Sequence, residues 1–182
     1  DPFDSKTLYF GSNVLHKSIN KGTSWEIISP DLTTNNAEQQ KEETGGLTLD
    51  ITGAENYNTI MAIAPSAKNK NVVWVGTDDG NVQLTQDGGK TWTNFRGKIP
   101  GMNVGSWITQ IQASRYNEGE AFVVSNDYRR GDFSITIFRT KDFGKTWENI
   151  LSNKGLKGYA LCMIQDPVQP NLIFVGTENG LW

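Results

Sequence analysis

The stretch TQDGGKTW, residues 85–92, decides the fold because it is repeated along the chain. It returns as TKDFGKTW at 140–147 and, more loosely, as SINKGTSW at 18–25. Catalytic residues are normally used once, whereas a motif that recurs within one chain usually belongs to the architecture. We therefore interpret the repeat first as part of the fold.

Each position of the motif has a physical role in a hairpin turn. The aspartate accepts hydrogen bonds from backbone N–H groups of the turn, and the glycine adopts positive φ without a Cβ clash. The Ser/Thr hydroxyl adds a bond across the turn, and Trp92 and Trp147 bury their rings between strands. An asparagine replaces the aspartate of the first copy, which an Asx turn tolerates. The predicted structural residues are Ser18, Asn20, Gly22 and Trp25, then Thr85, Asp87, Gly89 and Trp92, then Thr140, Asp142, Gly144 and Trp147. The repeat is thus explained without catalysis.

The apolar runs between the motifs predict short strands. Four matching runs, rich in aromatic and β-branched residues and ended by turn residues, lie at 7–13, 72–80, 121–127 and 172–180. Other apolar strands precede three of them, at 59–64, 107–114 and 159–165. Alternating strands follow at 81–85 and 134–140, and a last strand follows the motif at 91–95 and 146–150. The unit is therefore four strands, with the motif as the turn between the third and fourth.

The spacing of the units predicts the fold class. Trp25, Trp92 and Trp147 lie 67 (92 − 25) and 55 (147 − 92) residues apart, and a four-stranded unit of about 40–50 residues is typical of a propeller blade. The predicted boundaries are 1–33 for blade one, 34–56 for a surface loop between blades, 57–100 for blade two, 105–152 for blade three and 157–182 for the start of blade four. The chain is expected to be all-β, a β-propeller segment of about three to three and a half blades.

A ring of this kind closes with typically about 4–8 blades. We therefore expect this chain to be part of a larger propeller, completed by remaining blades of the same polypeptide or by a partner chain. The first predicted sheet lacks its first strand, and the last stops in mid-blade, which leaves edges that invite association.

Composition excludes several function classes. The net charge of −3 leaves no electrostatic footprint for nucleic acid. The one cysteine, Cys162, excludes an intrachain disulfide and a cysteine-based zinc site, and the one histidine, His16, excludes a Ser-His-Asp set within this chain. No apolar run approaches the roughly 18 residues of a membrane span. We expect no cofactor, no metal and no direct membrane insertion, with His16 as a packed or surface residue.

Two loops carry the predicted ligand-binding residues. SNDYRRGDF, residues 125–133, lengthens one turn and gathers aromatic and cationic side chains among carboxylates, a composition typical of recognition. GAENYNTI, residues 53–60, leads into an inner strand. The candidates are Tyr57, Trp107, Asp127, Tyr128, Arg129 and Arg130. A charged, solvated loop and aromatic packing between blades remain the alternative interpretations.

The repeated pattern resembles the bacterial neuraminidase repeat, or Asp box. Propellers with this repeat include sialidases, xyloglucanases, a photosystem II assembly factor and the sortilin family, and their boxes lie at the blade periphery. The longer sequence stretches at 8–33, 72–95, 139–150 and 165–182 are similar to those of large bacterial proteins grouped with the sortilin N-terminal propeller. The resemblance implies a secreted, periplasmic or cell-surface protein.

The resemblance favours a non-catalytic recognition module that binds protein, peptide or glycan, with a polypeptide ligand preferred because sortilin-like proteins bind peptides. One alternative is a glycan-cleaving hydrolase. The xyloglucanase-like form needs two carboxylates about 5–10 Å apart across a cleft. Asp78 with Asp79, and Asp127 with Asp132, are the pairs considered. We expect these carboxylates in solvated turns, with catalytic partners partly outside this segment.

A sialidase is the weaker form of the hydrolase hypothesis. It needs an arginine cluster for the carboxylate of its substrate. The arginine in FRGKIP, residues 95–100, is interpreted as a chance resemblance, and Arg139 is expected on a blade surface. A third hypothesis is a structural subunit of a cell-envelope assembly.

Overall fold

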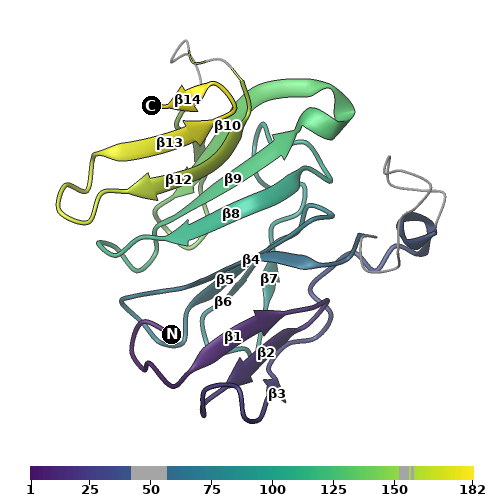
Figure 1. Ribbon diagram of the computed structural model, residues 1–182, viewed down its shortest axis with the longest axis vertical. Helices are drawn as coiled ribbons and strands as arrows, with labels where there is room; N and C mark the ends of the chain where they lie inside the picture. Colours follow the sequence, from purple (N-terminus) through teal and green to yellow (C-terminus); the bar gives the residue numbers. More distant parts are fainter. Residues whose placement is uncertain (42–56, 152–155, 157) are drawn as a thin grey trace.

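The computed structural model describes residues 1–41, 57–151, 156 and 158–182, and it consists of four antiparallel sheets (Figure 1). Sheet one contains β1 (Leu8–Gly11), β2 (Leu15–Ser18) and β3 (Glu26–Ile27). Sheet two contains β4 (Ile60–Pro65), β5 (Val73–Thr77), β6 (Val82–Thr85) and β7 (Thr93–Asn94). Sheet three contains β8 (Trp107–Ala113), β9 (Ala121–Asp127), β10 (Asp132–Thr140) and β11 (Glu148–Asn149). Sheet four contains β12 (Ala160–Gln165), β13 (Ile173–Thr177) and β14 (Gly180–Leu181).

Each sheet is a simple meander in which strands that follow one another in sequence are hydrogen-bonded neighbours. Sheet two lies between sheets one and three, and sheet four packs on the other side of sheet three (Figure 1). This is the arrangement of consecutive propeller blades, so the predicted all-β, partial β-propeller is confirmed. Short 3₁₀ turns occur at η1 (Ala37–Gln40) and η2 (Tyr128–Arg130). Within the described ranges no helix is long and apolar enough to span a membrane.

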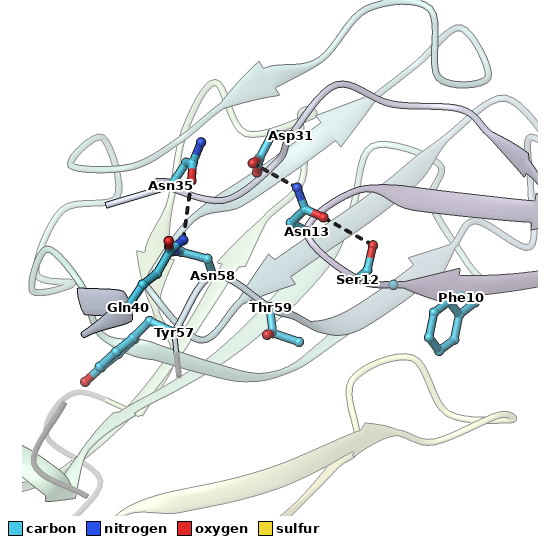
Figure 2. A pocket seen from close by; sticks show the side chains of 10 residues that line it. Phe10, Ser12, Asn13, Asp31, Asn35, Gln40, Tyr57, Asn58 and Thr59 are labelled. Carbon is cyan, nitrogen blue, oxygen red and sulfur yellow. Dashed lines mark hydrogen bonds between the residues drawn. The ribbon is translucent and has the colours of Figure 1, made fainter. Parts of the chain in front are cut away.

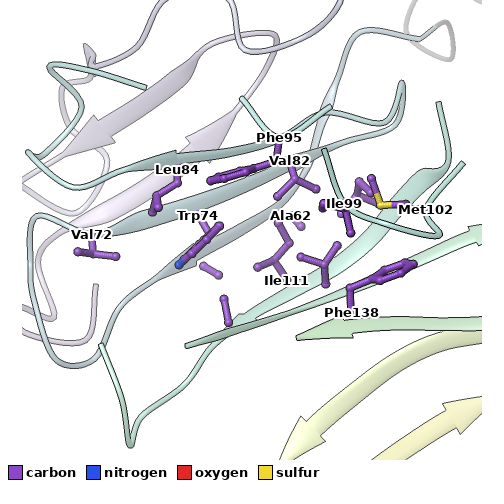
Figure 3. Close-up of a cluster of buried hydrophobic side chains, with 14 residues drawn as sticks. Ala62, Val72, Trp74, Val82, Leu84, Phe95, Ile99, Met102, Ile111 and Phe138 are labelled. Carbon is purple, nitrogen blue, oxygen red and sulfur yellow. The ribbon is translucent and has the colours of Figure 1, made fainter. Parts of the chain in front are cut away.

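The core lies between the sheets rather than within one of them. Each of three buried clusters joins two consecutive sheets, and the one between sheets two and three includes Trp74, Phe95, Ile111 and Phe138 (Figure 3). Hydrophobic burial between sheets stabilises the arrangement, because a single blade cannot bury its own apolar faces.

A glycine in β1 and one in the matching strand β5 explain how closely sheets one, two and three approach one another. A Cβ added to Gly76 would lie 2.4 Å from Cγ2 of Ile108 in the next sheet. A Cβ added to Gly11 would lie 2.6 Å from Cβ of Ile60. The glycine of the repeated strand therefore makes room for the first strand of the following sheet.

The three repeat turns hold their own polar groups. The Asp87 carboxylate accepts from the Thr91 backbone N–H at 2.9 Å and from the Thr91 hydroxyl at 2.6 Å. The Thr85 hydroxyl accepts from the Gly89 N–H at 2.9 Å, and the Trp92 Nε1–H donates to the Gly89 carbonyl at 3.1 Å. The hydrogen bonds from Thr91 lower the pKa of Asp87 to about 2.

The other two copies have the same geometry. Asp142 accepts from the Thr146 N–H at 2.9 Å and from its hydroxyl at 2.6 Å. In the first copy the Asn20 side chain accepts from the Ser24 N–H at 2.9 Å. The residues just after each aspartate are thus held by side-chain bonds. Pairing of the fourth strand begins only at Thr93 and at Glu148, so β7 and β11 are shorter than predicted.

Trp92 and Trp147, whose rings were predicted to be buried, are half-buried, whereas Trp25 of the first copy is exposed. Trp147 is half-buried and packs edge to face on Trp74 and Phe95 of the preceding sheet. Trp92 packs against the cluster between sheets one and two. Trp25 is 45% exposed, since the described residues form no sheet on that side of sheet one.

Most of the predicted loop between blades cannot be compared with the structure. Residues 42–56 lie outside the described residues. The described part of this segment contains η1, whose N-terminal Asn36 side chain accepts from the Glu38 backbone N–H.

Candidate functional site

The antiparallel meander separates the connections into two ends. The repeat turns lie at one end of the sheets, together with the connections from first to second strand in sheets two, three and four, and we call this the turn end. The connections from one sheet to the next lie at the opposite end, which we call the loop end, together with the connections from second to third strand in sheets two, three and four and the connection from β1 to β2 in sheet one. Two pockets open at the loop end.

The first pocket lies between sheets one and two and has a volume of about 690 Å³. Figure 2 shows Phe10 and Tyr57 on opposite sides of it, with polar side chains between them. Asn13 donates to Asp31 at 2.9 Å. Partial burial favours a higher pKa for Asp31, but hydrogen bonds from Thr33 and Asn13 outweigh it and lower the pKa below 3.8. The volume lies in the range of small-molecule sites.

His16 is close to this pocket. Its Nε2 lies 3.0 Å from the Ser12 Oγ, and its ring centroid lies 5.7 Å from that of Phe10. The histidine is half-buried between these two side chains. It is therefore a packed residue of sheet one.

The second pocket lies between sheets two and three and has a volume of about 190 Å³. It brings together five of the six predicted ligand-binding residues, namely Tyr57, Trp107, Asp127, Arg129 and Arg130. Four further polar residues of its wall were not among the predicted ligand-binding residues: Gln39, Asp78, Arg96 and Asn126. These side chains come from loops and strand ends of two sheets, so their proximity depends on the packing of one sheet against the next.

Asp127 holds the loop end of sheet three to the connection that precedes it. One carboxylate oxygen accepts from the Ser106 hydroxyl at 2.8 Å and from the Asn103 amide at 3.0 Å. The other oxygen accepts from the Arg130 guanidinium, which also donates to the Val104 carbonyl at 3.0 Å. Both oxygens of Asp127 are thus engaged within the protein, which argues for a structural role.

Arg129 and the aromatic side chains form the outer wall of the second pocket. The Arg129 guanidinium carbon lies 3.9 Å from the centroid of the Trp107 ring, a cation–π contact. Tyr128 does not line the pocket but stacks on Tyr159, with ring centroids 4.9 Å apart and an interplanar angle of 20°. The ring centroids of Phe133 and Tyr159 lie 6.2 Å apart, and Phe133 is 55% exposed. An aromatic surface therefore borders the pocket.

The expectation that Asp78 and Asp79 lie in a solvated turn is wrong. Asp79 is fully buried and accepts from the Thr34 N–H at 2.7 Å and from the Thr34 hydroxyl at 2.8 Å. Asp78 is half-buried and accepts from the Thr59 N–H at 2.9 Å. Burial, with a further contribution from the Asp79 charge, raises the pKa of Asp78 to about 6. Asp79 is buried because the segment around Thr34, which is 45 positions away in the sequence, covers the turn that contains Asp78 and Asp79.

Two further polar groups of the second pocket wall stand out. The Arg96 guanidinium donates to the Asp79 carbonyl. Asn126 is 2% exposed, and neither its amide nitrogen nor its amide oxygen has a hydrogen-bond partner. The Trp107 Nε1–H has no partner either. Arg96 lies in FRGKIP, the stretch whose likeness to a sialidase element was interpreted as chance. The sequence does not mark Asn126 as a site residue, because the place of its side chain depends on strand register.

Arg139, expected on a blade surface, is instead largely covered. Its Nε donates to the buried Glu120 carboxylate at 2.7 Å, and its guanidinium lies 5.4 Å from the Phe122 ring centroid. Strand register places Arg139 opposite Phe122, so the charged side chain packs along the sheet. It lies far from the second pocket in the fold, beside the repeat turn of sheet three.

The described residues contain no group of three or more His, Cys, Asp or Glu side chains that could hold a metal ion. Cys162 is exposed and free. The chemistry that the loop end offers is therefore that of carboxyl, guanidinium, amide and aromatic groups.

Comparison with known proteins supports the propeller architecture. No family model matches the chain. It is 30% identical over 107 residues to an oligoxyloglucan reducing-end-specific xyloglucanase of Emericella nidulans, an alignment that spans 58% of this chain and 13% of the relative.

Among solved structures, an ancestral GH74 enzyme matches with a TM-score of 0.67 at 17% identity, over 100% of this chain and 21% of its own. The GH74 xyloglucanase of Xanthomonas campestris matches with a TM-score of 0.65 at 17% identity, over 97% of this chain and 26% of its own. YCF48 bound to D1 peptide matches with a TM-score of 0.53 at 19% identity, over 96% of this chain and 44% of its own. The chain thus corresponds to a minor part of each relative, and these likenesses establish the β-propeller fold.

Proposed function

We propose that this chain forms part of the glycan-binding face of a glycan-cleaving β-propeller of the xyloglucanase type, with sugar bound at the loop end. One observation carries the proposal. The aromatic surface of Trp107, Tyr128 and Tyr159 borders a pocket whose wall includes Asp78, a carboxyl group with a pKa of about 6. The C–H faces of a sugar pack on aromatic rings, and glycoside cleavage requires a carboxylic acid that is protonated near neutral pH.

The relatives support this choice over pure recognition. The aligned relative is described as a xyloglucanase, and GH74 enzymes are among the structures of the same fold. Because the chain corresponds to 13% of that relative, the activity of the whole protein is part of the proposal. A sialidase receives no comparable support.

In this proposal Asp78 is the general acid that protonates the leaving oxygen. Its raised pKa matches that role, since a general acid works best when its pKa lies near the operating pH. Asp127 does not serve as the second carboxylate, because Arg130, Asn103 and Ser106 occupy both of its oxygens. The nucleophile or base would come from another part of the propeller.

A non-catalytic recognition module is the second candidate, and the engagement of Asp127 favours it. A peptide ligand belongs to this alternative, since YCF48 is described as bound to a D1 peptide. A structural subunit of an envelope assembly is a third candidate, to which the exposed apolar side chains of sheet four contribute, among them Ile164 and Leu181.

We also propose that the repeat turns are Asp boxes, that the chain belongs to the sortilin-like bacterial subgroup, and that the protein is secreted, periplasmic or on the cell surface. The shared hydrogen-bond geometry of the turns supports the first of these. The proposed blades are 1–33, 57–100, 105–152 and the start of a fourth at 157–182, separated by the loop 34–56.

The test is hydrolysis of xyloglucan oligosaccharides by the whole natural polypeptide that carries this sequence, followed as release of reducing ends. Asp78→Asn should lower kcat at least about 100-fold and change KM little, because it removes an acid but few contacts. Asp132→Asn is the matched control, a carboxylate of the loop end that does not line the second pocket. Sugar binding without hydrolysis in the wild type would favour the recognition module, and hydrolysis unchanged by Asp78→Asn would reject Asp78 as the acid.

A further inference from the structure

The second pocket is about the size of one sugar ring. Its volume of about 190 Å³ equals the share of about six liquid waters. It is below the roughly 300–1,000 Å³ of sites for drug-sized ligands. A single sugar unit of a longer chain is therefore the scale of ligand that it admits.

The wall of this pocket contains polar groups whose hydrogen-bonding capacity is unused. Asn126 is 2% exposed and lines the pocket, and both polar atoms of its amide lack a partner. The Nε1–H of Trp107, in the same wall, also lacks one. Buried polar groups in folded proteins are usually hydrogen-bonded, so a polar ligand at this position would satisfy groups that the protein leaves unpaired.

The wall also carries positive charge that the protein does not neutralise. Of its three guanidinium groups, Arg130 pairs with Asp127. Arg96 and Arg129 form no ion pair with a carboxylate among the residues that the structure describes. A Cβ added to Gly105 would lie 3.8 Å from Nη1 of Arg130 and 3.9 Å from Nη2 of Arg96, so these guanidinium groups flank one loop residue.

We propose that the second pocket binds a sugar residue that carries a carboxylate, such as a uronic acid, and that Arg96, Arg129 and Asn126 contact it. A guanidinium fork matches a carboxylate in shape and charge, and the unpaired amide offers one donor and one acceptor to sugar hydroxyls. The pocket is thus rich in donors, which a ligand with acceptors and negative charge complements.

Asp78 is the wall carboxyl that would oppose an anion. Its raised pKa of about 6 means that its neutral form persists to higher pH than that of an ordinary aspartate, which reduces this opposition. The inference rests on the proposed glycan function and specifies the class of sugar at the same site.

The experiment is calorimetric titration of the whole natural polypeptide with tri-galacturonate and with a glucuronate-bearing xylo-oligosaccharide, each compared with its own methyl ester. The ester preserves the sugar and removes only the charge. We expect at least one acid to bind about tenfold more tightly than its ester, the effect of one charge-assisted hydrogen-bond pair. Which of the two acids binds identifies the sugar.

Variants assign the contacts. Arg129→Gln and Arg96→Gln should each weaken binding of the acid about tenfold and leave the ester unchanged, whereas Asn126→Ala should weaken both. Arg96→Lys preserves the charge and loses the fork, so it should recover part of the affinity. Arg115→Gln, an exposed arginine outside the pocket, is the matched control. Unchanged thermal melting shows that each variant is folded.

The outcomes separate the two proposals. Equal affinity for acid and ester, with neutral xyloglucan oligosaccharides bound, overturns this inference and leaves the glycan function standing. Absence of binding to any sugar overturns both. Tighter binding of an acidic peptide than of either acidic sugar overturns the assignment to sugar while supporting the carboxylate contact.

Discussion

The repeat turns and the loop end of the sheets differ in where their polar side chains find partners. At the turn end, Asp87 and Asp142 bond to residues four positions away, with the same distances in both copies. At the loop end, Asp79 bonds to Thr34, which is 45 positions away, and Asn126 has no partner. The side-chain hydrogen bonds of the repeat turns are local and repeated, whereas those of the loop end join distant segments and differ between sheets.

This difference suggests that the repeat turns serve stability and the loops of the loop end serve recognition. A turn that satisfies itself locally can be repeated in every blade without reference to a ligand. Loops on a rigid scaffold commonly carry the binding residues, and unpaired polar groups mark where function outweighs local stability. Substitutions at the two ends should therefore have effects of different kinds.

The largest expected effect comes from two glycines in left-handed conformation, one at each end. A Cβ on Gly144, at φ +81°, would lie 2.5 Å from the Phe95 ring, whereas a Cβ on Gly131, at φ +77°, would meet nothing within 4 Å. Gly144→Ala should cost about 3 kcal/mol, from backbone strain plus overpacking, and Gly131→Ala about 1 kcal/mol from strain alone. Urea denaturation gives both values, and equal losses would contradict the contrast between the ends.

The second effect concerns the carboxylate that organises the loop end. Asp127→Ala removes the partner of Ser106, Asn103 and Arg130 at once. We expect a loss of about 2 kcal/mol in the free energy of unfolding, because the buried Ser106 and two more exposed groups lose a hydrogen-bond acceptor together. Asp132→Ala, on the same loop but bonded to the nearby Ser134, should stay within about 0.5 kcal/mol. If both variants unfold at the same urea concentration, Asp127 does not brace this loop.

A smaller effect is expected at Asp78, and it depends on pH. The pKa of this group is about 6 in the folded protein and 3.8 in the reference state, so the native state holds a proton that the unfolded chain has released. Stability should therefore fall as pH rises from about 4 to about 6. Asp78→Asn should remove this fall and stabilise the protein at pH 7 by about 1 kcal/mol after allowance for solvent screening. Parallel stability–pH curves for wild type and variant would contradict the raised pKa.

The smallest effect is expected at the repeat turns in acid. Hydrogen bonds from Thr91 lower the pKa of Asp87 to about 2, and the corresponding bonds from Thr146 lower that of Asp142. Their contribution should be complete above about pH 4 and lost as pH falls through about 2. Carboxyl-carbon NMR titration measures these values directly. A midpoint for Asp87 near 4 would show that the turn does not favour its ionised form.

The sequence was informative where the interactions are local. The repeat turns could be predicted from Thr85, Asp87 and Gly89, because the hydrogen bonds of the motif close within a few residues. The four-strand unit followed from the same spacing, and with it the partial propeller. The motif alone does not indicate that Trp25 is more exposed than Trp92 and Trp147, because burial of a motif tryptophan depends on the preceding sheet and not on the motif.

The candidate site was only partly predictable for the same reason. Loop composition drew attention to Trp107 and Arg129, which the structure brings to one pocket. Asp79 was assigned to a solvated turn because nothing in the sequence shows that Thr34 covers it. Asn126 lies near the end of the buried strand β9, and only the register of that strand against β8 brings its amide to the pocket wall.

The edge-to-face pair of Trp74 and Trp147 has an optical consequence. Their ring centroids lie 6.0 Å apart, one indole from sheet two and the other from the turn of sheet three. At this separation the excited states of two indoles couple, which gives an exciton signal in circular dichroism distinct from that of the strands. The protein therefore carries a built-in reporter of one interface. If this signal were lost while the strand signal remained, it would show two blades separating before either unfolds.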